Sequence, residues 1–213
     1  MSASDAADAT VLPMFPLGSV LFPSMPLVLH VFEPRYRTLT RHCLDGDRRL
    51  GVVLIERGSE VGGDDVRCSV GTRATIVDAV ELADGRWALG LIGEHRIRVE
   101  EWLPDDPYPV ARVESLPDRA PPGDREEQRA ALLRRLRQVL ALRTELGESA
   151  PPATVDVSSD PASAAWQVAV LAGLGPADGQ KVLETVDLDA RLARLGSLLD
   201  EQAEVLARRV AGG

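Results

Sequence analysis

The chain has 213 residues, 45% of them hydrophobic and 27% charged, so it can bury a substantial core as one large domain or two small ones. Its formal net charge of -9 at pH 7 argues against nucleic acid as a partner, because an acidic protein gains no long-range attraction to phosphate backbones. The opening MSASDAADAT lacks a secretory signal and no apolar run is long enough for a membrane span, so we expect a cytoplasmic chain. Cys43 and Cys68 form no CxxC pair, and in that setting we expect both thiols to be reduced.

The segment MFPLGSVLFPSMPLVLHVFEPRYR, residues 14–37, is apolar but unsuited to a helix until its last turn. Proline biases the preceding residue toward extended backbone and cannot donate a ladder hydrogen bond, which predicts an extended stretch along a sheet edge. The prolines that indicate this stretch are Pro13, Pro16, Pro23 and Pro26. At Pro34 a helix is expected to begin, and Gly46 is expected to end it. The residues that would share its buried face are Tyr36, Leu39, Thr40, Cys43 and Leu44.

Short strands are predicted next. Residues 50–56 form a continuous apolar run typical of a buried strand, and residues 70–82 alternate as in a strand with one face in water. The dipeptide Asp84-Gly85 predicts a two-residue hairpin turn. Gly93 then interrupts the alternation, which predicts a bulge or sharp bend. With further strands before and after residues 104–109, this half of the chain favours a small barrel or sandwich.

The chain changes character near residues 116–124, where proline and charge interrupt every periodicity. Beyond them the apolar residues recur at helical spacing. Asp160 is a candidate cap before Pro161, and Asp187 is a candidate cap for a long final helix. The domain boundaries that we predict are a flexible N-terminus at 1–10, a β-rich domain at 11–117, a linker at 118–124 and a helical subdomain at 125–213.

Several separated segments occur in the order found in one known family. They are FPLGSVLFPSMPLVLHVFEPRYRTL, GVVLIERGSEVG, VGTRATI, DGRWALGLIGEHRIRV and DPYPVARVESL, followed by VAVLAGL and QKVLETVDLDARLARLGSLL. Over about residues 12–206 the chain resembles the amino-terminal substrate-binding domain of Lon proteases. The resemblance implies an α+β fold, in which a PUA-like small β-barrel with one inserted short helix is followed by a C-terminal helical bundle.

Full-length Lon proteases continue into an ATPase and a peptidase that uses a serine and a lysine. This sequence has no G-x-x-x-x-G-K-[ST] phosphate loop, and its single lysine, Lys181, lies in a polar helical segment that resembles a non-catalytic region of Lon. We therefore expect a free-standing Lon substrate-binding domain that is not an enzyme and has no catalytic residue. His30, His42 and His95 have no metal-ligand spacing, so no metal and no cofactor is expected.

The resemblance implies a polypeptide-binding module that contacts unfolded or specific client proteins through apolar surface, and that could act as an adaptor presenting them to a protease. The candidate binding residues are Phe22, Met25, Val61 and Trp102, each of which is also compatible with a core position. Partners consistent with this hypothesis are client polypeptides, a protease and further copies of the chain, but not a membrane.

Two alternatives remain open at this point. The PUA-like architecture suggests RNA binding, which would use Arg96 and Arg98 with Trp87 or Trp102 for stacking, although the neighbouring acidic residues oppose it. The motif FEPRYR offers Glu33, Arg35 and Arg37 either as a grip for a ligand carboxylate or as an ion-pair network that fastens the helix start to the barrel.

Overall fold

The computed structural model describes residues 10–57, 66–120 and 122–212. These residues form six strands and five helices, divided into two compact units whose boundary falls between Pro117 and Asp118. The first unit holds all the described strands and one helix, and the second unit holds four helices. The predicted mixture of a sheet with an inserted helix and a following helical part is confirmed.

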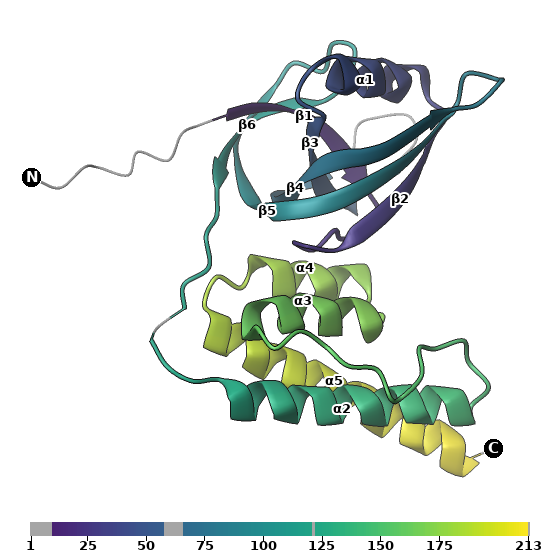
Figure 1. Cartoon of the computed structure of the whole chain (residues 1–213), viewed down its shortest axis with the longest axis vertical. Helices are drawn as coiled ribbons and strands as arrows, with labels where there is room; N and C mark the ends of the chain where they lie inside the picture. The colour runs from purple at the N-terminus through teal and green to yellow at the C-terminus, as the bar shows by residue number, and fades with distance from the viewer. Residues whose placement is uncertain (1–9, 58–65, 121, 213) are drawn as a thin grey trace, which may run out of the picture. The chain divides into compact units, whose positions relative to one another are not determined.

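The first unit is built on one sheet (Figure 1). Its strands are β1 (Thr10–Leu17), β2 (Pro26–Val31), β3 (Arg49–Arg57), β4 (Val66–Glu81), β5 (Trp87–Leu103) and β6 (Val110–Ser115). Their order is β2-β5-β4-β3-β1-β6, and β6 also pairs with β5, so the sheet curls round until its last strand meets the strand next to the opposite edge. The long β5 makes this arrangement because its first part pairs with β2 and its last part with β6.

The proline-rich segment lies in the sheet as two different strands. β2 pairs only with β5 among the described residues, so it is the predicted edge strand. β1 instead pairs with β6 through residues 10–13 and with β3 through residues 14–17. Each half of β1 therefore has a ladder on one side only, which leaves room for Pro13 and Pro16 although neither can donate a ladder bond.

The hairpin between β4 and β5 is confirmed, but its loop has three residues instead of the predicted two. The N–H of Leu82 donates to the carbonyl of Arg86 (2.8 Å), and the N–H of Gly85 donates to the carbonyl of Leu82 (2.8 Å). Gly85 has a φ of +77°, which is the left-handed position that closes a three-residue hairpin loop. Asp84 and Gly85 thus make the turn together with Ala83.

The irregularity predicted at Gly93 is a bulge. Arg73 pairs with His95 and Ala74 with Gly93, so Glu94 is the extra residue on β5. A Cβ atom at Gly93 would clash with the carbonyl oxygen of Phe22. Glycine is required here because the backbone before β2 approaches β5 closely, as the hydrogen bond from the N–H of Ser24 to the carbonyl of Gly93 (2.8 Å) shows.

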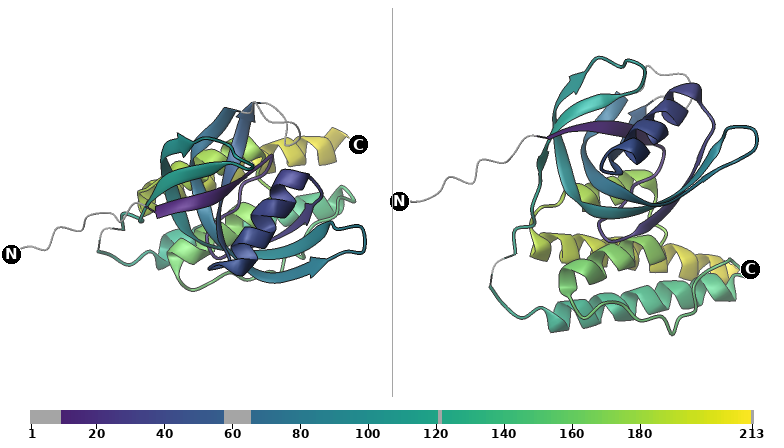
Figure 2. Two further views of the ribbon diagram at one scale, coloured as in Figure 1. Left: turned by 90° about the horizontal axis from the view of Figure 1, so that it is seen from above. Right: turned by 45° about the horizontal axis from the view of Figure 1, so that its top comes forward.

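The inserted helix, α1 (Pro34–Asp45), has the predicted bounds and the predicted buried face. Pro34 occupies its first turn and Gly46 follows its last residue. The ring of Tyr36 stacks on that of Phe15 from β1, with centroids 4.2 Å apart, and Leu39 is fully buried. In the two views of Figure 2, α1 lies across one end of the curled sheet, where its apolar face completes the core.

The second unit consists of α2 (Glu126–Glu145), α3 (Pro161–Leu171), α4 (Pro176–Glu184) and α5 (Leu188–Gly212). The two long helices α2 and α5 lie side by side (Figures 1 and 2). Both predicted caps are confirmed, since the Asp160 carboxylate accepts from the N–H of Ser163 (2.8 Å) and the Asp187 carboxylate from the N–H of Ala190 (2.9 Å). The buried stripe of α5 is Leu188, Leu192, Leu195, Leu199, Ala203 and Leu206.

A buried ion pair fixes the start of the second unit. Arg191 on α5 is fully buried, and its guanidinium donates to the Asp118 carboxylate at 2.6 and 2.9 Å. The backbone of Arg119 exchanges hydrogen bonds with Val186 and Leu188 (both 3.0 Å). Residues 118 and 119, which the sequence assigned to a linker, are therefore held by the segment that enters α5.

Candidate functional site

Three neighbouring strands present an apolar surface to solvent. Val28 of β2 pairs with Gly90 of β5, and Ala88 of β5 pairs with Val80 of β4. Directly paired residues point to the same face of a sheet, so these positions form one surface. We call it the outer face, and its exposed apolar side chains are Val28 (68% exposed), Val77 (56%), Val80 and Ile92.

The alternate residues of the same strands point inward. Leu29, Leu89 and Leu91 are buried and belong to the core beneath α1. The period-two alternation that gives a strand one buried face thus places valine and isoleucine on the opposite, uncovered face. Scattered exposed valines need no explanation, but a group aligned across three strands is typical of a surface that contacts another molecule.

A bulge shapes the middle of the outer face. Ile76 pairs with Leu91 and Asp78 with Gly90, which leaves Val77 as an extra residue on β4. A Cβ atom at Gly90 would lie 3.7 Å from Cγ2 of Val77, so the valine side chain lies beside the space that this glycine leaves open. The bulge turns Val77 toward solvent, and Gly90 keeps the surface around it shallow.

A polar cluster borders the outer face at the other bulge. Glu94 accepts hydrogen bonds from the Thr75 hydroxyl and from Nε of Arg73 (2.5 Å). Partial burial would raise the pKa of the Glu94 carboxyl, but these hydrogen bonds and the nearby arginines outweigh it and lower that pKa. The cluster stays charged at neutral pH, so it forms a polar rim beside the apolar surface.

The sequence-predicted binding residues are not brought together. Phe22 is only 5% exposed and belongs to the core, so its side chain offers no surface to a ligand. Met25 is half-buried against the core, at the entrance to β2. Trp102 packs on a second core cluster, with the Arg67 guanidinium 4.6 Å above its ring. Val61 lies outside the described residues.

The outer-face residues were missed by the sequence analysis. Alternation indicated that residues 70–82 have one wet face, and Val77 falls out of that alternation because of the bulge. Val28 belongs to β2 and Ile92 to β5, and which face of these two strands meets water depends on how they pair with their neighbours. The β-branched residues indicated that these segments are strands, but they do not tell which valine and isoleucine side chains stay exposed once the sheet has formed.

The arginines of the RNA alternative do not form a basic patch with its tryptophans. Arg96 is 2% exposed and donates from Nη2 to the carbonyl of Pro117 (3.1 Å), while Arg98 pairs with Glu114 (3.4 Å). For the FEPRYR motif the structure shows an ion pair between Arg35 and Glu33 (3.2 Å), with the guanidinium 4.5 Å from the Tyr36 ring. Glu33, Arg35 and Tyr36 thus contact one another at the start of α1.

The described residues contain no group of three or more histidine, cysteine, aspartate or glutamate side chains arranged to hold a metal ion. Lys181 is exposed, and its Nζ pairs with Asp178 (3.1 Å), one turn away on α4. Among the helices described, none combines the length and the apolar character needed to cross a membrane.

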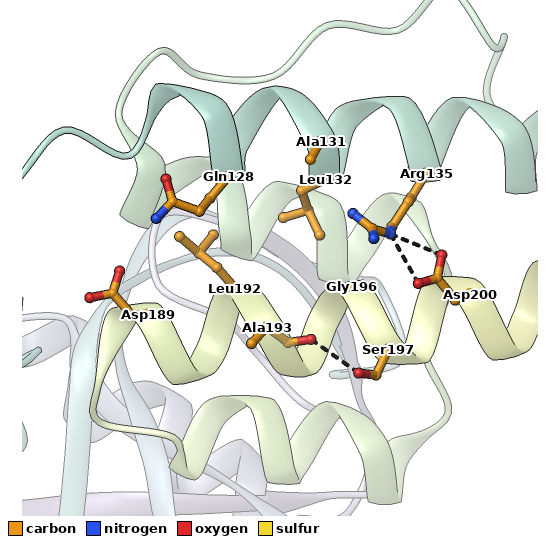
Figure 3. Close-up of a pocket in the computed structure, with 10 residues that line it drawn as sticks. All are labelled: Gln128, Ala131, Leu132, Arg135, Asp189, Leu192, Ala193, Gly196, Ser197 and Asp200. Atoms are coloured by element: carbon orange, nitrogen blue, oxygen red, sulfur yellow. Dashed lines mark hydrogen bonds and ion pairs between the residues drawn. The ribbon is translucent and has the colours of Figure 1, made fainter.

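The helical unit has a separate depression between α2 and α5, with a volume of about 420 Å³ (Figure 3). Leu132 and Leu192 line it, and Gly196 faces the guanidinium of Arg135. One side is closed by Arg135, whose Nε donates to both carboxylate oxygens of Asp200 at 2.9 and 3.1 Å. The Ser197 hydroxyl donates to the carbonyl of Ala193 (3.3 Å), and Asp189 pairs with Arg125 (2.6 Å), so these polar groups already have partners where the helices pack around small residues.

Comparison with known proteins agrees with the resemblance seen in the sequence. The chain matches the family described as the ATP-dependent protease La (LON) substrate-binding domain over residues 11–201. It is 32% identical over 201 residues to Lon protease of Anaeromyxobacter dehalogenans and, over the same length, to Lon protease 2 of Myxococcus xanthus. Each alignment covers 92% of this chain but only 24% of the relative, so the chain spans about a quarter of these proteins.

Two solved structures share the fold. A Lon N-terminal domain protein from Xanthomonas campestris aligns with a TM-score of 0.61 and 29% identity, covering 87% of this chain and 96% of that one. The N-terminal domain of Lon protease from the Mycobacterium avium complex aligns with a TM-score of 0.62 at 17% identity, covering 92% and 98%. Sequence and fold therefore agree that the chain belongs to the family of Lon substrate-binding domains.

Proposed function

We propose that the chain is a polypeptide-binding module that contacts unfolded or exposed segments of client proteins through the outer face. The observation that carries the proposal is the alignment of exposed apolar side chains across β2, β5 and β4 in a member of a substrate-binding family. Unfolded chains have apolar side chains in common whatever their sequence, so an apolar face can bind many of them.

The proposal includes an adaptor role without chemistry of its own. Presentation of a bound client to a protease needs a binding surface but no ATPase or peptidase group. A Ser-Lys dyad requires a desolvated lysine, whereas Lys181 is exposed and paired with Asp178. We expect the purified chain to leave casein intact in the presence of ATP.

The two separate cysteines fit a reducing cytoplasmic setting.

The test is a titration of a fluorescently labelled, reduced and carboxymethylated lactalbumin with the wild-type chain and with a Val77→Ser/Val80→Ser double variant. Both valines are exposed, so the variant should keep its melting temperature while its affinity falls about tenfold. Val170→Ser is the matched control, because Val170 is a similarly exposed valine (47%) on α3. Equal affinity of wild type, double variant and control would contradict the proposed surface.

A nuclease-treated sample separates this function from the RNA alternative. Nucleic acid binding by the chain would be lost on nuclease treatment and would weaken steeply with salt. Binding of the lactalbumin should survive nuclease and depend little on salt, because the valine and isoleucine side chains of the outer face would make the contacts. Binding of freshly added RNA by the treated and repurified chain, with no binding of the unfolded protein, would favour the alternative.

A further inference from the structure

β2 has one edge without a ladder. Among the described residues it pairs only with β5. The N–H of Gly93 donates to the carbonyl of Met25 (3.0 Å), so that carbonyl points toward β5. Backbone groups alternate in direction along a strand, and hence the N–H and C=O groups of Val28 and His30 point away from β5. Pro26 lies two residues before Val28, so its nitrogen also points away from β5, where the lack of an N–H costs no ladder hydrogen bond.

A small cavity opens along this free edge. It has a volume of about 130 Å³ and is lined by residues 28–33 together with Phe15, Leu17 and Tyr36. Phe15 and Tyr36 stack on one another and form an aromatic wall. A cavity of about 150 Å³ in a protein core accepts a benzene ring, so this one has room for a single apolar side chain.

The edge lacks the usual protection against pairing with another chain. Natural edge strands carry charges, bulges or several prolines that discourage strand addition. β2 has Pro26 only at its first position, and it exposes Val28 and the following Phe32 (55% exposed). Glu33, which lines the cavity, forms an ion pair with Arg35 at 3.2 Å. An uncharged, extended segment is therefore the ligand that fits this edge.

We propose that the free edge of β2 takes up an extended segment of a client polypeptide as an additional strand, with one apolar side chain of that segment in the cavity. Main-chain hydrogen bonds to Val28 and His30 would supply affinity for any sequence, and the cavity would select an apolar residue at one position. The inference rests on the proposed polypeptide-binding function and adds the mode of binding. The edge is continuous with the outer face because Val28 belongs to both.

The protein arm of the test compares His30→Pro with His30→Thr. Proline removes the outward N–H of residue 30 but no ladder bond to β5, and the extended backbone before it tolerates proline. Threonine keeps the N–H and the strand propensity. We expect His30→Pro to weaken binding of the labelled lactalbumin about tenfold and His30→Thr to change it less than about twofold. Thermal melting of both variants confirms that they are folded.

The peptide arm needs no variant of the protein. A capped heptapeptide of alternating threonine and leucine is prepared with N-methyl groups on either its threonines or its leucines. An added strand uses the N–H groups of one edge only, so one methylated peptide should lose about tenfold in affinity while the other retains it. Equal affinities of the two methylated peptides, or of folded His30→Pro and wild type, would overturn strand addition. Binding of lactalbumin without binding of the parent heptapeptide would contradict strand addition but not the proposed function. Binding of neither would contradict both.

Discussion

At the scale of single residues, Arg191 illustrates how the helical unit tolerates a charge in its interior. Its guanidinium donates to Asp118 and to the carbonyl of Thr185, and it lies 3.9 Å from the centroid of the Trp166 ring. Carboxylate, carbonyl and ring together replace the water that the charge has lost. A pairing of this kind contributes less to net stability than its contacts suggest, but removing one partner is costly.

Arg191→Met should therefore lower the free energy of unfolding by about 3 kcal/mol, because it removes the ion pair between the buried guanidinium and the partly buried Asp118 carboxylate. Arg194→Met is the control, since Arg194 is exposed on the same helix, and its effect should stay within about 0.5 kcal/mol. Urea unfolding followed by circular dichroism measures both. Similar unfolding curves for the two variants would show that the buried pair is not a determinant of stability.

The two cysteines should differ sharply in reactivity. Burial, with a smaller contribution from the Asp47 carboxylate, raises the pKa of the Cys43 thiol to about 12. The thiolate is the reactive form, so at pH 8 Cys43 should resist alkylation in the folded chain while the partly exposed Cys68 reacts. Iodoacetamide labelling with peptide mass spectrometry measures each site, with urea-unfolded chain as the control. Labelling of Cys43 as fast as Cys68 in the folded chain would contradict this assignment.

At the scale of strands and helices, the bulges decide where side chains end up. Glu94 and Val77 are each the extra residue of a bulge. Glu94 contacts Arg73 in the polar cluster, and Val77 is exposed on the outer face. The close approach at Gly93 allows the segment before β2 to lie against β5. The position of β2, and with it the free edge, thus depends on Gly93 of β5.

Gly93→Ala should destabilise the chain by about 2 kcal/mol, because its Cβ would meet a backbone carbonyl that cannot move aside like a flexible side chain. Gly212→Ala, at the end of α5 with nothing within 4 Å of the added atom, should change stability by less than about 0.5 kcal/mol. Thermal melting of the two variants provides the comparison. A Gly93→Ala variant as stable as Gly212→Ala would mean that the backbone relaxes around the bulge.

Local pattern was sufficient to predict α1, both aspartate caps and the β4–β5 hairpin, because each is determined by residues close in sequence. It was not sufficient for the candidate surface. Whether Phe22 or Val28 is exposed depends on which face α1 covers and which strand lies beside β5, and both are long-range facts. Arg191 was missed for a related reason, since its partner Asp118 is far away in the sequence.

At the scale of the whole chain, each unit has its own core, so we propose that each folds alone. A piece that begins at residue 118 keeps the Asp118–Arg191 pair and the backbone bonds of Arg119, whereas a piece that begins at residue 125 loses them. We expect the piece 118–213 to be more stable than 125–213 by about 3 kcal/mol in urea unfolding. Equal stability of the two pieces would place the functional boundary at residue 125, as the sequence alone suggested.

We propose that the strand-rich unit binds polypeptide through β2 and the outer face. Amide hydrogen exchange of the full chain, with and without saturating reduced and carboxymethylated lactalbumin, tests it most directly because it reports every region at once. We expect slower exchange in peptides that cover residues 26–32, 74–81 and 87–92, with the free-edge amides of Val28 and His30 among the protected ones. Protection confined to the four helices of the second unit, or no protection at a concentration that saturates binding, would contradict it.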